Sequence, residues 1–167
     1  MIFSSNDRGF SLFEMIVVLI IISLATSLTV PQLAGTLMKM NAKTSAKKVA
    51  AALRYARSRA VAEKIPYLSV FDLETNRLAV MDYRQWTEIL ESGENFFAPE
   101  SGAKVYDLPD GVHFEKNRKK GFDDLSEQIA FYPTGGSSGG KIVIADEQDR
   151  KYTVYADFIT GAVELIE

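Results

Sequence analysis

The 167-residue chain contains no cysteine and only one histidine, His113. Without cysteine it can form no disulfide framework, thiolate zinc site, cysteine nucleophile or iron–sulfur cluster. A single histidine rules out metal sites built on a histidine pair and argues against a histidine-based catalytic triad. We therefore expect no cofactor and no metal, and we interpret His113, which lies in a strand-like pattern, as a structural residue.

Three short segments resemble catalytic or binding motifs, but each lacks an essential part. Residues 45–48 fit S-x-x-K, yet the other elements of a penicillin-binding site are absent. The glycine-rich segment 135–140 precedes a predicted strand rather than a helix, so it is interpreted as a mobile turn and not as a phosphate cradle. Residues 146–149 lack the glycine and terminal glutamate of an EF-hand loop and are predicted to form a polar hairpin turn. No enzymatic activity and no small-molecule substrate are expected.

Acidic residues are absent between Met15 and Ala62. The most apolar stretch of the chain, residues 10–30, overlaps the beginning of this segment. Fifteen of the 21 residues in 10–30 are apolar, and Glu14 is their only charge. As a helix this run would be about 31 Å long, which matches a hydrocarbon core of roughly 30 Å. We predict a retained transmembrane helix. A cleaved secretory signal fits less well, because its apolar region is about 7–15 residues long and ends at an A-x-A-like site.

Glu14 lies only four residues inside this apolar run, where an unpaired carboxylate is costly. One interpretation places it at the interface, with its carboxylate among the lipid headgroups. The other requires a cation that neutralises it. Because no basic residue follows until Lys39, only a newly made amino terminus close by could supply that cation from within the chain.

The sequence Arg-Gly-Phe-Ser-Leu-Phe-Glu ends at Glu14 and leads into the apolar run. It resembles the class III signal of the type IV pilin superfamily, in which a short polar leader ends in Gly, Phe follows, and Glu is the fifth mature residue. The resemblance implies that a prepilin peptidase removes residues 1–9 by cleaving between Gly9 and Phe10, and that Phe10 is N-methylated. It also implies that Glu14 sits opposite the Phe10 ammonium of a neighbouring subunit. Such a pair would favour one axial register between adjacent helices.

The charges around the apolar run point to two opposite orientations. Only Arg8 precedes it, whereas Lys39 and Lys43 are among four lysines that follow it within 18 residues. Counting positive charges alone would place the C-terminal part in the cytoplasm. The resemblance implies the reverse: a single-pass inner-membrane protein whose head lies in the periplasm, where it assembles into a filament.

Residues 31–64 are predicted to continue the helix as an amphipathic stem. Pro31, which the resemblance counts among the assembly residues, and Gly35 weaken the helix, so this part either bends at the membrane surface or unwinds in a filament. From residue 38 an apolar stripe recurs at steps of three and four, and the dipeptide Ile65-Pro66 ends the helix. The stripe consists of Met38, Ala42, Ser45, Val49, Leu53, Ala56 and Ala60.

An adjacent face of the stem is basic and is a candidate interaction surface. Residues 39–64 contain eight basic groups and one acid, whereas residues 65–167 contain ten basic and nineteen acidic groups. Basic stem and acidic head should attract one another, within a subunit or between neighbours. The alternative is a solvated face that touches anionic lipid headgroups. The face consists of Lys39, Lys43, Lys47, Arg54 and Arg57.

Residues 65–167 are predicted to form a β-rich globular head of short antiparallel strands. The segment 84–110 is ambiguous, with one helical turn around Trp86–Leu90, and 116–127 is expected to be an exposed loop. Gly161 is expected to adopt positive φ in a turn. The predicted strands are Tyr67–Leu73, Leu78–Tyr83, Val112–Glu115, Gln128–Tyr132, Lys141–Ala145, Tyr152–Asp157 and Ala162–Ile166.

The C-terminal part is similar to the GspH/FimT branch of the superfamily. The similarity rests on residues 131–140, the strand, acidic turn and strand that follow, and Thr-Gly-Ala-Val at 160–163. The resemblance implies a type IV pilin-like α+β fold, in which a long N-terminal helix packs on an antiparallel β-rich head.

The function implied is that of a minor pseudopilin, a structural subunit of the type II secretion pseudopilus that exports proteins across the outer membrane. The expected partners are other pseudopilins, the prepilin peptidase and the inner-membrane assembly platform. The alternative is a minor type IV pilin of a pilus or DNA-uptake apparatus. Some minor pilins of this branch bind DNA through basic C-terminal residues, but this chain ends in the acidic Thr-Gly-Ala-Val-Glu-Leu-Ile-Glu, so nucleic-acid binding is not expected.

Overall fold

A computed structural model describes residues 11–115 and 127–166, without the side chains of residues 27–40. The predicted cleavage site between Gly9 and Phe10 and nearly all of the predicted loop 116–127 lie outside the described residues. The chain divides into two compact units, residues 1–37 and 38–167. In the part of the chain that is described, no helix combines the length and apolar character needed to cross a membrane.

Helix α1, Leu12–Glu63, accounts for the described part of the first unit and runs into the second. Its bounds agree with the helix predicted over residues 10–64, and the helical assignment continues through Pro31. Lys64 ends the helix in the left-handed conformation, at φ 59°. The Tyr67 hydroxyl donates to Glu63 at 2.6 Å and Arg59 pairs with Glu63 at 2.5 Å, which fixes the passage into the first strand.

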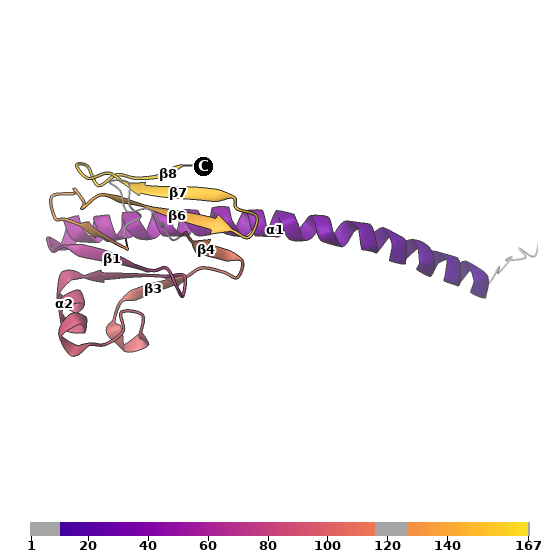
Figure 1. The fold of residues 1–167 in the computed structure, drawn as a ribbon, viewed down its shortest axis with the longest axis horizontal. Coiled ribbons are helices and arrows are strands. Elements are labelled where there is room, and N and C mark those ends of the chain that lie inside the picture. The colour runs from indigo at the N-terminus through magenta and orange to yellow at the C-terminus, as the bar shows by residue number, and fades with distance from the viewer. Residues whose placement is uncertain (1–10, 116–126, 167) are drawn as a thin grey trace, which may run out of the picture. The chain divides into compact units, whose positions relative to one another are not determined.

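The head contains two antiparallel four-stranded sheets (Figure 1). Sheet A has the order β3-β2-β1-β5 and sheet B the order β4-β6-β7-β8. Sheet A consists of β1 (Tyr67–Asp72), β2 (Arg77–Asp82), β3 (Lys104–Asp107) and β5 (Gln128–Phe131). Sheet B consists of β4 (Val112–Phe114), β6 (Gly140–Asp146), β7 (Lys151–Ala156) and β8 (Val163–Ile166).

The predicted apolar stripe of α1 forms the centre of the main core. Its six members from Ala42 to Ala60 are all at most 2% exposed, while the side chain of Met38 lies outside the described residues. All of them except Ser45 share one hydrophobic core cluster with Phe131 of sheet A and Ile144 of sheet B. The stripe therefore packs against both sheets, and the predicted α+β architecture of a helix on an antiparallel β-rich head is confirmed.

A second layer covers the other face of sheet A. Helix α2, Tyr83–Ser92, is longer than the single turn predicted there, because both of its ends are capped. The Asp82 carboxylate accepts from two backbone N–H groups of the first turn, and Gly93 closes the helix at φ 71°. The helix, the short 3₁₀ helix η1 (Pro99–Ser101) and strand β3 occupy the segment that the sequence left ambiguous. A small cluster of Ala79, Met81 and Ile89 forms this second core.

We expect Leu53→Ala to lower the free energy of unfolding by about 2–5 kcal/mol, because it leaves a cavity where α1 meets the sheets. Leu53 is 0% exposed. The measurement is chemical denaturation of the full-length protein in detergent.

Leu90→Ala is the matched control, because the same substitution in α2 removes a side chain that is 52% exposed. It should change the free energy by only about 0.5 kcal/mol. Equal losses for the two variants would show that α1 does not organise the core.

Candidate assembly surface

Glu14 lies in the first turn of α1 and is exposed, as are all its described neighbours up to Thr26. The large apolar side chains here are uncovered in the isolated chain: Leu12 is 79% exposed and Leu19 is 65% exposed. Because Phe10 lies outside the described residues, the predicted pairing of Glu14 with its ammonium stays a prediction.

Two of the five basic residues of the candidate interaction surface bind the head of their own subunit. Arg54 Nη2 donates to the Val163 carbonyl at 2.8 Å, and Arg57 Nε donates to the Gly135 carbonyl at 2.9 Å. Both guanidinium groups are therefore held in fixed positions at the border between α1 and sheet B. Among the three lysines, Lys47 is exposed, Lys43 is half-buried and makes its own contact, and the side chain of Lys39 is not described.

The glycine-rich segment 135–140 is an anchored loop, so its interpretation as a mobile turn was wrong. Besides the bond from Arg57, the Ser137 N–H donates to the Phe158 carbonyl at 3.1 Å and its hydroxyl donates to the Asp157 carbonyl at 2.8 Å. The Ser138 N–H donates to the Ala130 carbonyl at 2.8 Å. The loop thus links α1, strand β5 and the turn between β7 and β8.

That turn, residues 157–161, is itself rigid. The Asp157 carboxylate accepts from the backbone N–H groups of Ile159 and Thr160 and from the Thr160 hydroxyl, and these bonds lower the pKa of Asp157. Gly161 adopts φ 63°, as the sequence predicted. The turn presents Phe158 and Ile159 to solvent at 66% and 81% exposure. Two large apolar side chains are thus displayed on a fixed backbone.

The predicted hairpin turn at 146–149 is held by a buried carboxylate and exposes charged side chains. Asp146 is 2% exposed, and its carboxylate accepts from the backbone N–H groups of Gln148 and Arg150 and from Arg150 Nε at 2.6 Å. Burial raises the pKa of Asp146, but these bonds outweigh burial and hold the pKa below its usual range. The turn that Asp146 stabilises exposes Glu147 and Asp149 at its tip.

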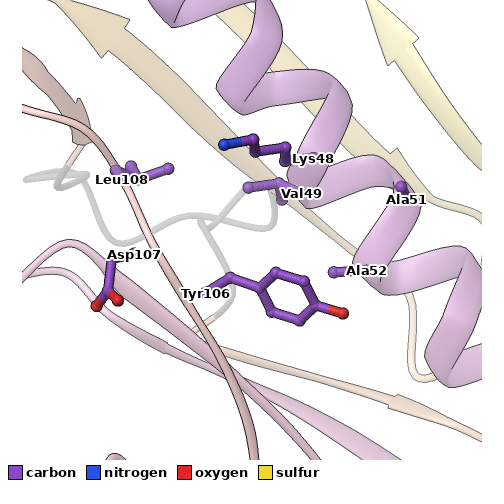
Figure 2. Close-up of a pocket in the computed structure, with 7 residues that line it drawn as sticks. All are labelled: Lys48, Val49, Ala51, Ala52, Tyr106, Asp107 and Leu108. Carbon is purple, nitrogen blue, oxygen red and sulfur yellow. The ribbon is translucent and has the colours of Figure 1, made fainter.

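A pocket of about 340 Å³ lies between α1 and the edge strand β3 (Figure 2). The Tyr106 ring points toward α1, whereas the Asp107 carboxylate turns away from it. Lys104 Nζ lies 4.4 Å from the Tyr55 ring centroid, so a cation–π contact fastens β3 to the helix. The pocket is lined by Lys48, Val49, Ala51, Ala52, Tyr106, Asp107 and Leu108.

No described group of three or more acidic or histidine side chains is arranged to hold a metal ion. His113 lies exposed on β4, opposite Ala145 of β6. The described surface offers fixed guanidinium groups, an exposed apolar turn and an acidic turn.

Comparison with known families decides the relationship. The family model "Type II transport protein GspH" matches residues 45–157, from the buried stripe of α1 to the turn after β7. The chain belongs to the GspH family. A model of the prokaryotic N-terminal methylation motif matches residues 4–30. Both resemblances drawn from the sequence, to the type IV pilin superfamily and to its GspH/FimT branch, are confirmed.

Individual relatives agree with the family. This GspH-family chain is 30% identical over 158 residues to type II secretion system protein H of Xanthomonas campestris pv. campestris, with 93% of this chain and 81% of the relative covered. The minor pseudopilin EpsH of Vibrio cholerae has a similar fold, with TM-score 0.54, 16% identity and coverage of 77% of this chain and 97% of EpsH. The type IV minor pilin FimU of Pseudomonas aeruginosa has the same TM-score, with 15% identity and coverage of 77% and 90%.

Gly161→Ala should destabilise this GspH-family chain strongly. A Cβ at Gly161 would collide with the Gly135 carbonyl and lie 3.0 Å from Arg57 Nε, so the turn and the anchored loop would have to separate. We expect a loss of about 1–3 kcal/mol from this collision, in addition to about 1 kcal/mol for positive φ, measured by denaturation of the full-length protein.

Gly93→Ala isolates the backbone contribution, because Gly93 has φ 71° and a Cβ there would meet nothing within 4 Å. It should cost only about 1 kcal/mol. If both variants lost the same free energy, the contact between turn, loop and Arg57 would not contribute to stability.

Proposed function

We propose that the chain is a minor pseudopilin, a structural subunit of the type II secretion pseudopilus that takes part in protein export across the outer membrane. The match of the GspH family model to residues 45–157 carries this proposal. The match of the methylation-motif model to residues 4–30 supports it, because this range includes the predicted cleavage site and the start of α1. The protein works by assembly with other pseudopilins and not as an enzyme.

The assembly step begins at the N-terminus. Prepilin peptidase cleaves between Gly9 and Phe10, the Phe10 amine is methylated, and the helix waits in the inner membrane with the head in the periplasm. The inner-membrane assembly platform then moves the subunit into the pseudopilus. The apolar side chains from Leu12 to Leu24 are exposed in the isolated chain. This supports both the membrane-inserted state and the assembled state, because lipid would cover them in the first and neighbouring helices in the second.

The Glu14 carboxylate neutralises the Phe10 ammonium of the neighbouring subunit in this scheme. A charge pair in an apolar surrounding is favourable only when both groups are in place, and a lone charge there is costly. The pair therefore selects one axial register.

A minor type IV pilin of a pilus or of a DNA-uptake apparatus is the alternative. The likeness to FimU, at 15% identity, concerns the fold and does not separate the two functions. The C-terminal strand β8 argues against DNA binding, because Glu164 is its only charged residue and a carboxylate repels the phosphate backbone.

Deletion of the gene tests the proposed function. Loss of extracellular export, restored by the intact gene, with unchanged DNA uptake and twitching, is the expected result. Normal export together with lost DNA uptake would establish the alternative. Mass spectrometry of the membrane-extracted protein should show a chain that begins at N-methylated Phe10.

Glu14→Ala should abolish export while the protein remains in the membrane fraction. The substitution removes the partner of the Phe10 ammonium but adds no charge to the apolar segment. The measurement combines fractionation of the cells with an assay of exported protein.

Glu91→Ala is the control, because it removes the same carboxylate from an exposed position on α2. It should leave export nearly unchanged. Full export by Glu14→Ala would contradict the pairing of Glu14 with the ammonium.

A further inference from the structure

The two most exposed large apolar side chains of the described head lie next to each other in turn 157–161. They are Phe158 and Ile159, at 66% and 81% exposure. The turn joins β7 to β8 beside the C-terminal part of α1 (Figure 1), where a Cβ built on Gly161 would lie 3.0 Å from Arg57 Nε. Val61, on the same part of the helix, is also exposed. Exposed apolar groups that gather at one place mark a surface for a partner.

The backbone that presents these side chains is already fixed. The Asp157 carboxylate accepts from the backbone N–H groups of Ile159 and Thr160. A Cβ built on Gly136 would lie 3.0 Å from the Ile159 carbonyl, so the anchored loop packs directly against the turn. A surface that is ordered before binding loses little conformational entropy when a partner arrives. The turn is therefore suited to docking as it stands.

An open hollow of about 430 Å³ beside the turn carries positive charge. Arg54 and Arg57 line it, and each gives one nitrogen to a backbone carbonyl of the head. Their other guanidinium N–H groups have no partner among the described residues. Arginines held in this way are suited to bind carboxylates, because the planar fork of donors is already oriented. The remaining lining residues are Ser58, Val61 and Ala62.

The hollow is a positive site on a head that is acidic as a whole. Residues 65–167 contain ten basic and nineteen acidic groups. Within the described ranges no carboxylate pairs with Arg54 or Arg57, because the acids at this end of the head are bound elsewhere. The Asp157 carboxylate accepts from its own turn, and Glu63 binds Arg59 and Tyr67. The hollow and its apolar border are thus complementary to a carboxylate with apolar neighbours.

We propose that this arginine surface binds an acidic and apolar segment of a different pseudopilin in the pseudopilus. Charge complementarity selects carboxylates for the two guanidinium groups, and the exposed turn surrounds these pairs with apolar contacts that exclude water. The partner is a different chain because a minor subunit has few copies in the filament, so other pseudopilins border its head. The inference rests on the proposed function and adds the surface and the chemistry of the contact. The arginine surface consists of Arg54, Arg57, Val61, Phe158 and Ile159.

Photo-cross-linking from the apolar turn tests the identity of the partner. The full-length chain carries benzoylphenylalanine in place of Phe158 and is produced in cells that make the complete secretion system. Illumination should give one main adduct, in which mass spectrometry identifies a different pseudopilin joined at a segment that contains Asp or Glu. The control carries benzoylphenylalanine in place of Leu90, which is 52% exposed on α2, and should give at least fivefold less of this adduct.

Charge reversal tests the arginines. Arg54→Glu should lower the yield of the adduct about fivefold or more, since an attraction becomes a repulsion. Replacing the facing carboxylate of the identified partner by arginine should restore the yield, which a misfolded head could not allow. Arg84→Glu, the same change at an exposed position of α2, should leave the yield unchanged.

Ile159→Ser tests the apolar contacts at a position where the side chain is too exposed to support folding. The yield of the adduct should fall roughly tenfold, because one large apolar side chain buried in an interface contributes about that much to affinity, and export should fall with it. Leu90→Ser, a matched loss of an exposed apolar side chain on α2, should change neither.

Four results would overturn the proposal: an adduct between two copies of this chain, an adduct with an exported protein, no protein adduct from position 158, or a yield that neither Arg54→Glu nor Ile159→Ser lowers. Export that is lost on gene deletion but unaffected by both variants would refute the contact alone. Normal export on gene deletion would refute the proposed function.

Discussion

The head depends on the packing of one helix against two sheets at once. Because sheets A and B both reach α1, the buried face of the helix has to be smooth, and it is built largely from alanine and serine with Val49 and Leu53 as the larger groups. Ala42, Ala46, Ala56 and Ala60 are all 0% exposed. Larger side chains would push the sheets apart, since a close-packed interior has no spare volume.

The same packing determines what Arg54 and Arg57 do. They stand where the buried face of α1 meets solvent, and their guanidinium groups reach the carbonyls of Val163 in β8 and of Gly135 in the anchored loop. Those carbonyls gain a donor, as backbone acceptors near a core require. The long side chains are also held in one orientation before any partner arrives, which reduces the entropy lost on binding. A lysine, with a flexible point charge, would give neither effect to the same degree.

The sequence predicted the parts of the fold that depend on local pattern. The period of the stripe identified the buried face of α1, and alternation with turn residues identified seven of the eight strands in the described residues to within one or two residues. Strand β3, Lys104–Asp107, was missed because its strand state depends on pairing with β2. The anchoring of the glycine-rich loop was also missed. Arg57 and Gly135 lie 78 residues apart, and Arg54 and Val163 lie 109 apart, so no local pattern relates them.

The candidate site also has one part that the local sequence predicts and one part that only the fold creates. The resemblance to a processing motif can be read from seven consecutive residues, because it depends only on residue types and their spacing. The distribution of charge over the head cannot, since only the strand pairing places Glu147 and turn 157–161 at opposite ends of sheet B, and only the fold brings Arg54 to the Val163 carbonyl. A subunit that joins a filament needs two unlike surfaces, because like surfaces close into a symmetric dimer. In this GspH-family chain, the antiparallel order of β6, β7 and β8 places one turn at each end, and the residues of those turns make the ends unlike.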